Sequence, residues 1–320
     1  MDEYPKDTKE FDKWFPSDNE CLNYIIRLRW PNGYQCPHCH VVGQSWLRDR
    51  GRIKCKNCRH EQSVTGGTIF HRSHTPLRTW FKIMWHICLQ KNGYSAMSLQ
   101  RSLGFSYPTA WLCLHKLRKA MGQNRKDLLS GEVEVDETYV GGVHKGKRGR
   151  GSGGKEIVLV AAERKISKKG NSIIGRIRLV CIPDVTRKTL HDAISLLVAP
   201  GATIVTDGWK AYNRLEKLGY EHKIEINGKV EKTPFGEENV ILDTSPLPKC
   251  HRVISLMKRW ILGTLQGSIG KDHIQDYLHE FTFRFNRRNS KARGMLFWRL
   301  AQMAVDNEPT TKKEIYANHI

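Results

Sequence analysis

The sequence predicts an α/β protein whose α/β part follows a cysteine-bearing segment and a helical section. Three observations predict this class. Residues 131–290 alternate strand-like and helix-like runs, residues 76–121 place apolar side chains at helical spacing, and four of the nine cysteines form two C-x-x-C pairs. The predicted segments are an N-terminal helix with the cysteine pairs, a helical domain, an α/β domain, and a C-terminal helix and tail, at 1–70, 71–128, 129–290 and 291–320.

The charge of the chain points to an anionic partner. The 320 residues include 53 Lys and Arg against 32 Asp and Glu, a formal net charge of +21. A surplus of this size attracts polyanions, of which nucleic acid is the commonest, with an anionic membrane surface as the rival. No apolar run reaches the roughly 18 residues of a spanning helix, and the start MDEYPKDTKEFDKW is polar and acidic, unlike a signal peptide. We therefore expect a cytoplasmic protein that acts on nucleic acid and does not bind membranes.

The two cysteine pairs have the spacing of a zinc site. Cys36 and Cys39 form the first pair, and Cys55 and Cys58 form the second after fifteen intervening residues. Two such turns can offer four thiolates to one tetrahedral Zn²⁺, and the intervening QSWLRDRGRIK can form the hairpin that joins them. Four thiolates close the coordination shell, so the predicted zinc is structural. Four unligated thiols are the alternative.

The helical section contains two runs that meet at Gly104-Phe105, SAMSLQRSLG and SYPTAWLCLHKLRKAM. Ser106 is a good N-cap for the second run, and Pro108 suits its first turn. The pattern fits a helix-turn-helix that places its second helix in the major groove, with a plain helical hairpin as the alternative. In the first reading, the phosphate contacts are Lys116, Arg118 and Lys119.

In the α/β section, strands are predicted at 132–140, 155–163, 172–182 and 202–207, and helices at 187–198, 208–218, 249–264 and 271–286. The glycine- and proline-rich residues 226–248 are predicted as a loop. Between the first two strands lies GGVHKGKRGRGSGGK, which is too polar to join a core. We expect a basic hairpin loop there whose DNA-phosphate contacts are Lys145, Lys147, Arg148 and Arg150.

Two aspartates stand at strand ends, Asp136 in EVEVD and Asp207 in ATIVTD. Alternation along a strand sends Asp136 and Glu137 to opposite faces, so these two neighbours do not easily share an ion. Aspartates at the ends of neighbouring strands can instead converge on one cleft and hold two Mg²⁺ ions for phosphoryl transfer. Capping of the following segment is the structural alternative for each aspartate.

A third ligand would complete such a site, and four residues qualify as candidates: Glu237, Glu238, Glu280 and His251. Glu280 has Arg287 seven positions later, whereas the first two glutamates have no basic residue at that spacing. His251 belongs to one polar helical stripe with Ser255 and Lys258. On the residues alone, His251 and Glu280 remain open alternatives.

Taken together, the ordered blocks RWPNGYQCPHCH, SVTGGTIFH, VEVDETYVGG, TDGWKAY, HRVISLMKRWILGT and YLHEFTFRFNRR resemble bacterial insertion-sequence transposases of the ISXO-type group over most of the chain. The resemblance implies an RNase H-like mixed sheet flanked by helices, with a DDE-type site. Asp136 and Asp207 match the first two positions, and His251 matches the third, with Lys258 seven residues later. The neighbouring Arg259 is expected to contact DNA as well.

The histidine at the third position departs from the family's carboxylate pattern. A neutral imidazole adds no negative charge and is a softer ligand than a carboxylate, so Mn²⁺ is expected to support this site relatively well beside Mg²⁺. The departure puts tight binding of the second ion in doubt.

The resemblance implies a DNA transposase that binds the terminal inverted repeats of its own element. The expected chemistry is metal-dependent hydrolysis at the ends, followed by attack of the freed 3′ hydroxyls on target DNA. Cutting two ends together implies a homodimer or larger assembly on DNA. The alternatives are a zinc-ribbon, helix-turn-helix regulator with an inactive α/β domain, and a nuclease that does not join ends.

Overall fold

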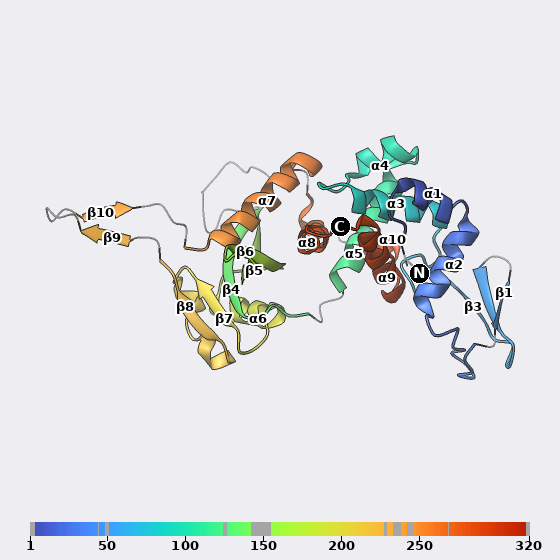
Figure 1. The fold of residues 1–320 in the computed structure, drawn as a ribbon, viewed down its shortest axis with the longest axis horizontal. Helices are drawn as coiled ribbons and strands as arrows, with labels where there is room; N and C mark the ends of the chain where they lie inside the picture. The colour runs from blue at the N-terminus through green and yellow to red at the C-terminus, as the bar shows by residue number, and fades with distance from the viewer. Residues whose placement is uncertain are drawn as a thin grey trace. The chain divides into compact units, whose positions relative to one another are not determined.

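The computed structural model describes residues 4–43, 45–48, 51–123, 127–141, 155–226, 229–232, 238–241, 246–267 and 269–317. The chain divides into two compact units (Figure 1). Met1–Asn124 and Arg287–Ile320 form the first unit, and Arg125–Asn286 form the second. The segments 1–70, 71–128 and 291–320, separated in the sequence-based prediction, thus fall essentially within one unit. Among the described residues, no helix combines the length and the apolar character needed to cross a bilayer.

The first unit joins a small sheet to a set of helices drawn from both ends of the chain. Its three-stranded antiparallel sheet has the order β1-β2-β3, with bounds Ser45–Arg48, Arg52–Cys55 and Glu61–Ser63. Its helices are α1 Thr8–Trp14, α2 Asp18–Arg29, α3 Leu77–Leu89, α4 Ala96–Leu103, α5 Tyr107–Gln123, α9 Arg293–Asp306 and α10 Lys312–Ala317.

Phe297 on α9 lies at the centre of the aromatic core of this unit. Its ring centroid is 5.5–6.0 Å from five aromatic rings on or next to α1, α2 and α3: Phe11, Phe15, Tyr24, Phe81 and Trp85. Buried aromatic side chains contribute large areas to a core, and edge-to-face contacts, such as those of Phe297 with Phe11, Phe81 and Trp85, add to it. Helix α9, from the C-terminal part of the chain, therefore completes the core that the N-terminal helices begin.

The predicted pair of helices in this unit is α4 and α5, joined by a short turn at Gly104. This glycine has φ +74°, a left-handed conformation that ends α4 and suits a residue without Cβ. The Ser106 hydroxyl accepts a hydrogen bond from the Thr109 backbone N–H at 3.4 Å, which confirms the predicted N-cap. The first exposed residues of α5 are Tyr107 and Pro108.

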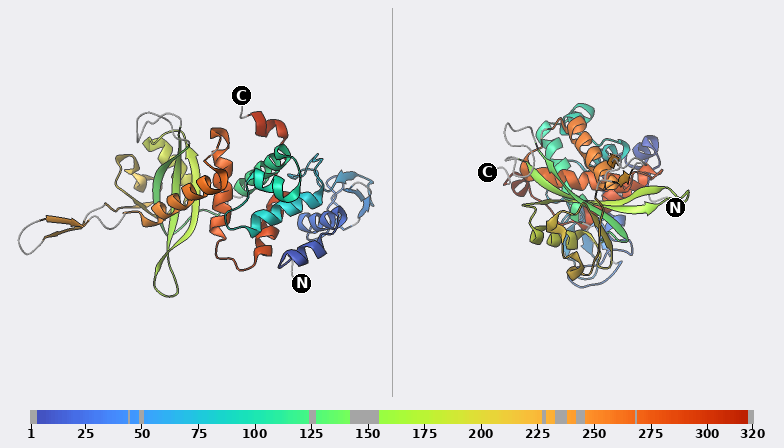
Figure 2. Two further views of the ribbon diagram at one scale, coloured as in Figure 1. Left: turned by 90° about the horizontal axis from the view of Figure 1, so that it is seen from above. Right: turned by 90° about the vertical axis from the view of Figure 1, so that its left-hand side faces the viewer.

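The second unit is built on a five-stranded mixed sheet in the order β6-β5-β4-β7-β8 (Figure 1). The long strands β4, β5 and β6 are antiparallel, whereas β7 and β8 run parallel to β4. Figure 2 shows β5 and β6 as a long hairpin. The bounds are Glu132–Val140, Glu156–Ile166, Ser172–Ile182, Thr203–Thr206 and Glu221–Ile224. This sheet confirms the predicted α/β class and is consistent with an RNase H-like fold.

Helices cover both faces of the sheet. On one face, α7 (Pro248–Leu265) and α8 (Ile274–Asn286), which follows the turn η4 (Lys271–His273), share an apolar core with Val160 and Val205. On the other face, α6 (Arg187–Leu197) shares a core with Val135 and Ile204. The candidate site lies on the face that α7 covers, at the middle of β4 and the end of β7.

The edge strand β6 is closed by two amide side chains. The Gln275 amide accepts from the Cys181 N–H at 2.9 Å, and the Asn286 amide both accepts from and donates to the backbone of Ile177. An edge strand otherwise offers its N–H and C=O groups to a foreign strand. These amides of α8 therefore satisfy the edge internally.

Two predicted elements differ from the structure. Residues 208–218 do not form one α-helix but two 3-10 turns, η2 (Lys210–Tyr212) and η3 (Leu215–Leu218), because Arg214 between them has φ +75°. Within 226–248, predicted as a loop, two segments form an antiparallel pair, β9 (Lys229–Lys232) and β10 (Glu238–Ile241). The loop prediction followed glycine and proline content and missed the cross-strand pairing.

Candidate active site

The two predicted aspartates lie on one face of the sheet. β4 pairs with β7 in parallel register, with Glu134 opposite Val205. Continuing both chains by two residues brings Asp136 and Asp207 to the same level, and the period of two keeps each on the face of Val205 that α7 covers. Glu137 points to the other face, where its carboxylate accepts a hydrogen bond from the Tyr212 hydroxyl at 2.7 Å.

The backbone after Asp207 holds its carboxylate at the end of β7. Asp207 Oδ1 accepts a hydrogen bond from the Trp209 N–H at 3.0 Å. Gly208 has φ +85°, and a Cβ there would lie 2.9 Å from Ile224 Cγ2. Glycine is therefore required for the turn that leaves Asp207 exposed beside the sheet.

His251 meets Asp136 from the first turn of α7. Its Nε2 lies 3.2 Å from Asp136 Oδ2, with 48 % of the histidine side chain and 14 % of the aspartate side chain exposed. The structure thus brings a strand-borne carboxylate and a helix-borne imidazole together at one accessible point. Oxygen and imidazole nitrogen donors are both ligands for Mn²⁺ and related divalent ions.

The environment of Asp136 opposes its negative charge. Burial raises the pKa of Asp136 to about 6, with Glu137 and Asp207 adding to the rise and His251 acting against it. Neighbouring carboxylates disfavour ionisation of each other, and a bound cation reverses this effect. The cluster therefore has the electrostatic character of a cation site.

Among the other candidates for a third ligand, the structure describes the side chain of Glu280. Glu280 is buried on α8, with 1 % of its side chain exposed, and pairs with Arg284 Nε at 3.3 Å. Glu237 falls outside the described residues, and only the backbone of Glu238 is described. Of the two candidates whose side chains are described, His251 lies against Asp136 and Glu280 does not.

A basic stripe continues from His251 along the exposed side of α7. Ser255, Lys258 and Arg259 are all exposed. Burial of its stem and the neighbouring Lys155 lower the pKa of Lys258, while Asp136 raises it, so the ammonium lies within electrostatic reach of the candidate site. This stripe presents positive charge beside the carboxylates.

The other predicted DNA contacts are basic residues on α5 and in the loop after β4. Lys116 and Arg118 expose only 7 % and 2 %, and Lys119 is partly buried. This burial contradicts the predicted phosphate contacts of Lys116 and Arg118, because a phosphate backbone reaches only side chains at the surface. Helical periodicity defines the faces of α5 but does not show which of them other elements cover. The predicted basic loop with Lys145, Lys147, Arg148 and Arg150 lies outside the described residues.

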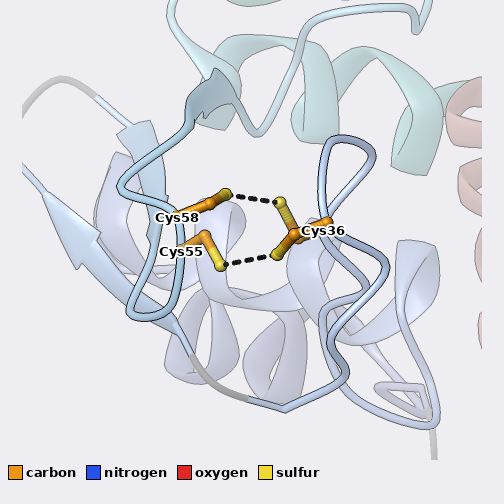
Figure 3. A group of neighbouring side chains, drawn as sticks. Cys36, Cys55 and Cys58 are labelled. Atoms are coloured by element: carbon orange, nitrogen blue, oxygen red, sulfur yellow. Dashed lines mark hydrogen bonds between the residues drawn. The ribbon is translucent and has the colours of Figure 1, made fainter.

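The four cysteines of the two pairs converge in the first unit. Their Sγ atoms all lie within 4.8 Å of one another, with Cys36 and Cys58 at 3.5 Å and Cys39 and Cys55 at 3.6 Å (Figure 3). None of them forms a disulfide. Zn–S bonds of about 2.3 Å in a tetrahedron need sulfurs at about this separation. The residues present therefore fit one structural zinc ion.

Both cysteine pairs use the same backbone turn. The His40 N–H donates to the Cys36 carbonyl, and the Arg59 N–H donates to the Cys55 carbonyl. Both donors have left-handed φ values, 59° and 64°. A left-handed conformation is uncommon for residues other than glycine and persists where the surrounding structure requires it. The repeated turn aims two sulfurs from each side at one point.

The sequence did not single out Tyr212, which contacts Glu137 beside the site. Its side chain is fully buried, and burial together with Glu137 raises the pKa of its hydroxyl. The hydrogen bond turns the Glu137 carboxylate away from Asp136. Tyr212 is the last residue of the block TDGWKAY, from which the sequence predicted a functional role for Asp207 alone.

Comparison with known proteins agrees with this arrangement. Residues 128–286 match the family of ISXO2-like transposase domains, and residues 16–61 match the transposase zinc-ribbon domain. A relative described as an uncharacterized protein in transposable element ISH50 of Halobacterium salinarum is 27 % identical over 297 residues, covering 85 % of this chain and 92 % of the relative. These matches confirm the resemblance to insertion-sequence transposases and its zinc ribbon.

Proposed function

We propose that this chain is the transposase of an insertion sequence, of the ISXO2-like group, and that it cuts the ends of its element and joins them to target DNA. The observation that supports this most directly is the 3.2 Å contact of His251 with Asp136, on the sheet face where Asp207 follows the neighbouring strand. A binding protein has no need of these three donors together at one accessible point of the sheet. The transposase domain match supports the same reaction class.

Asp136, Asp207 and His251 would hold the catalytic Mg²⁺ or Mn²⁺ ions. When bound, two such ions activate the attacking hydroxyl and stabilise the leaving oxygen of an in-line displacement at phosphorus. Hydrolysis at the element's end and the later strand transfer are both displacements of this kind, so one site can serve both. Zinc in the four-cysteine site would have no part in this chemistry, because four thiolates leave no open position.

The basic stripe of α7 would bind the DNA next to the reacting phosphate. Lys258 and Arg259 are exposed and can therefore contact phosphate oxygens. The zinc ribbon and the α4–α5 pair would recognise the terminal inverted repeats. A homodimer or larger assembly would hold two ends at once, in the cytoplasm and close to the nucleoid.

Excision and strand transfer from a plasmid carrying the native element test the proposal. Wild type, Asp207→Asn and His251→Ala would be compared in Mg²⁺ and in Mn²⁺, with end binding measured in parallel. We expect both variants to bind ends and to lose joining by on the order of 100-fold or more. Asp192→Asn, an exposed aspartate on α6, is the matched control and should join DNA like wild type.

Each remaining outcome points elsewhere. A wild type that binds ends and never cuts them would support a DNA-binding regulator. Cut products without joined ones would indicate a nuclease. Full joining by His251→Ala would remove His251 from the ligand set.

A further inference from the structure

Glu134 is a buried carboxylate two residues before Asp136 on β4. It is 0 % exposed, and it lies on the face of the sheet that α7 covers. A buried charge persists only when its oxygens are fully hydrogen-bonded. Glu134 Oε2 accepts from the backbone N–H of Lys249 at 2.7 Å and from that of Cys250 at 2.8 Å.

These two N–H groups are the ones that the first turn of α7 leaves open. Leu247, the N-cap, makes no side-chain hydrogen bond, and Pro248 at the first helical position has no N–H. The next two positions are Lys249 and Cys250. Glu134 therefore replaces a local cap with one supplied from the sheet, and its negative charge suits the positive end of the helix.

The other oxygen of Glu134 is held from the opposite side. Arg164 Nε on β5 donates to Glu134 Oε1 at 2.7 Å. The same guanidinium donates two hydrogen bonds to Glu225, at 2.9 and 2.7 Å. The two-bond pair with Glu225 fixes the guanidinium, and its Nε then holds Glu134 Oε1. Arg164 thus holds one oxygen of the Glu134 carboxylate while the other oxygen binds α7.

The Cys250 side chain adds a second tie between α7 and the sheet. Its thiol lies 3.2 Å from the Glu134 carbonyl oxygen and 3.4 Å from the Val160 carbonyl oxygen, and it is fully buried. Burial raises the pKa of this thiol, which keeps it a donor. The residue immediately before His251 is thus bound to both β4 and β5.

We infer that Glu134 is a positioning residue that fixes the first turn of α7 and so sets His251 against Asp136. Glu134 and Asp136 stand on one strand, while Cys250 and His251 stand on one helical turn. The Glu134 hydrogen bonds therefore set the distance between Asp136 and His251. The inference deepens the proposed function, on which its catalytic part depends.

Glu134→Gln tests the inference, because the amide has the same shape but its NH₂ faces a donor where the carboxylate had an acceptor. Glu163→Gln is the matched control. Glu163 is also a 0 % exposed carboxylate of this sheet, and it pairs with Arg176 at 2.6 Å rather than with α7. Glu134→Asp keeps the charge and shortens the reach, so it separates hydrogen bonding to α7 from simple neutralisation of Arg164.

The full-length, zinc-loaded protein would be used for two measurements. Hydrogen exchange of the Lys249 and Cys250 amides reports the anchor without any metal or DNA. Mn²⁺ binding by electron paramagnetic resonance, together with strand transfer, reports the site. In Glu134→Gln and Glu134→Asp we expect both amides to exchange faster and Mn²⁺ affinity and strand transfer to fall, each by about 10- to 100-fold. Glu163→Gln should leave all three readouts at wild-type values.

The measurements separate the inference from the function that it rests on. Unchanged amide exchange in Glu134→Gln, or an equal loss in Glu163→Gln, overturns the anchor. Full recovery in Glu134→Asp overturns it as well, because charge alone would then suffice. If the Glu134 variants exchange the two amides faster while the wild type neither binds Mn²⁺ nor joins DNA, the anchor is retained and the proposed function is rejected. If Glu134→Gln does not fold, the shorter Glu134→Asp supplies the same readouts.

Discussion

His251 Nε2 lies 3.2 Å from Asp136 Oδ2, and this contact joins the first turn of α7 to the middle of β4. In the proposed active site, this histidine would supply the third metal ligand beside the aspartate. Its chemistry differs from that of a carboxylate, because an imidazole nitrogen is softer and carries no negative charge.

His251→Glu should shift the metal preference of strand transfer. A carboxylate favours Mg²⁺, so the ratio of activity in Mg²⁺ to activity in Mn²⁺ should rise about fivefold or more. Strand-transfer rates in the two metals provide the measurement. Ser255→Glu places the same charge one turn further along α7 and should leave the ratio unchanged; an equal shift there would mean that added charge, not the ligand position, sets the preference.

The four-cysteine site should hold about one equivalent of zinc in the purified protein. Cys55→Ser should lower the zinc content to near zero and unfold the small sheet, because zinc binding supplies much of the folding free energy of such modules. Metal analysis and thermal unfolding would measure both effects.

Cys21→Ala is the control for the zinc experiment. Cys21 is buried on α2, where burial raises the pKa of its thiol to about 12. The variant should retain its zinc. Wild-type protein with far less than one equivalent would refute the structural zinc site.

Phe297→Ala should destabilise the first unit by about 3–5 kcal/mol, because it removes the ring at the centre of the aromatic core. Hydrogen exchange would show faster opening of α1, α2 and α3 and unchanged protection of β4 and β5. Met295→Ala, at a residue 39 % exposed on the same helix, should change the free energy of unfolding little. A uniform loss over both units would contradict this division of the core.

Glu225 should contribute stability that acid removes. Arg164 and then Lys223 hold its pKa at about 2, below its ordinary 4.5. A depressed pKa stabilises the folded state above pH 4.5, and this contribution is lost as the pH falls from 4.5 towards 2. Glu225→Gln should therefore cost about 1–3 kcal/mol of unfolding free energy at pH 7 and almost nothing near pH 2.

Denaturant unfolding across this pH range measures the difference in unfolding free energy between wild type and Glu225→Gln. The contributions of the other acidic groups are the same in both proteins and cancel in this difference. Glu216→Gln is the control, since Glu216 is 61 % exposed and lies 3.7 Å from His222. A wild-type advantage that persists unchanged at pH 2 would show that the carboxylate charge is not its source.

Local patterns in the sequence were sufficient for much of this protein. The spacing of Cys36, Cys39, Cys55 and Cys58 defined a four-sulfur site, because each pair closes a turn within a few residues. Period-two patterning predicted the bounds of β4 and β6 and placed Asp207 at the end of β7. Asp136, which the run EVEVD placed at a strand end, lies instead in the middle of β4. These properties depend on neighbours in the chain, so composition and periodicity reveal them.

Only the tertiary structure decided which distant groups meet. His251 and Glu280 both stand on helices with a basic residue seven positions later, yet packing sets one against Asp136 and buries the other beside Arg284. The exposed or buried state of Lys116 and the return of Phe297 to the N-terminal core likewise follow from which helix faces are covered. Helical period defines faces but not their partners, because packing partners are chosen by the whole fold.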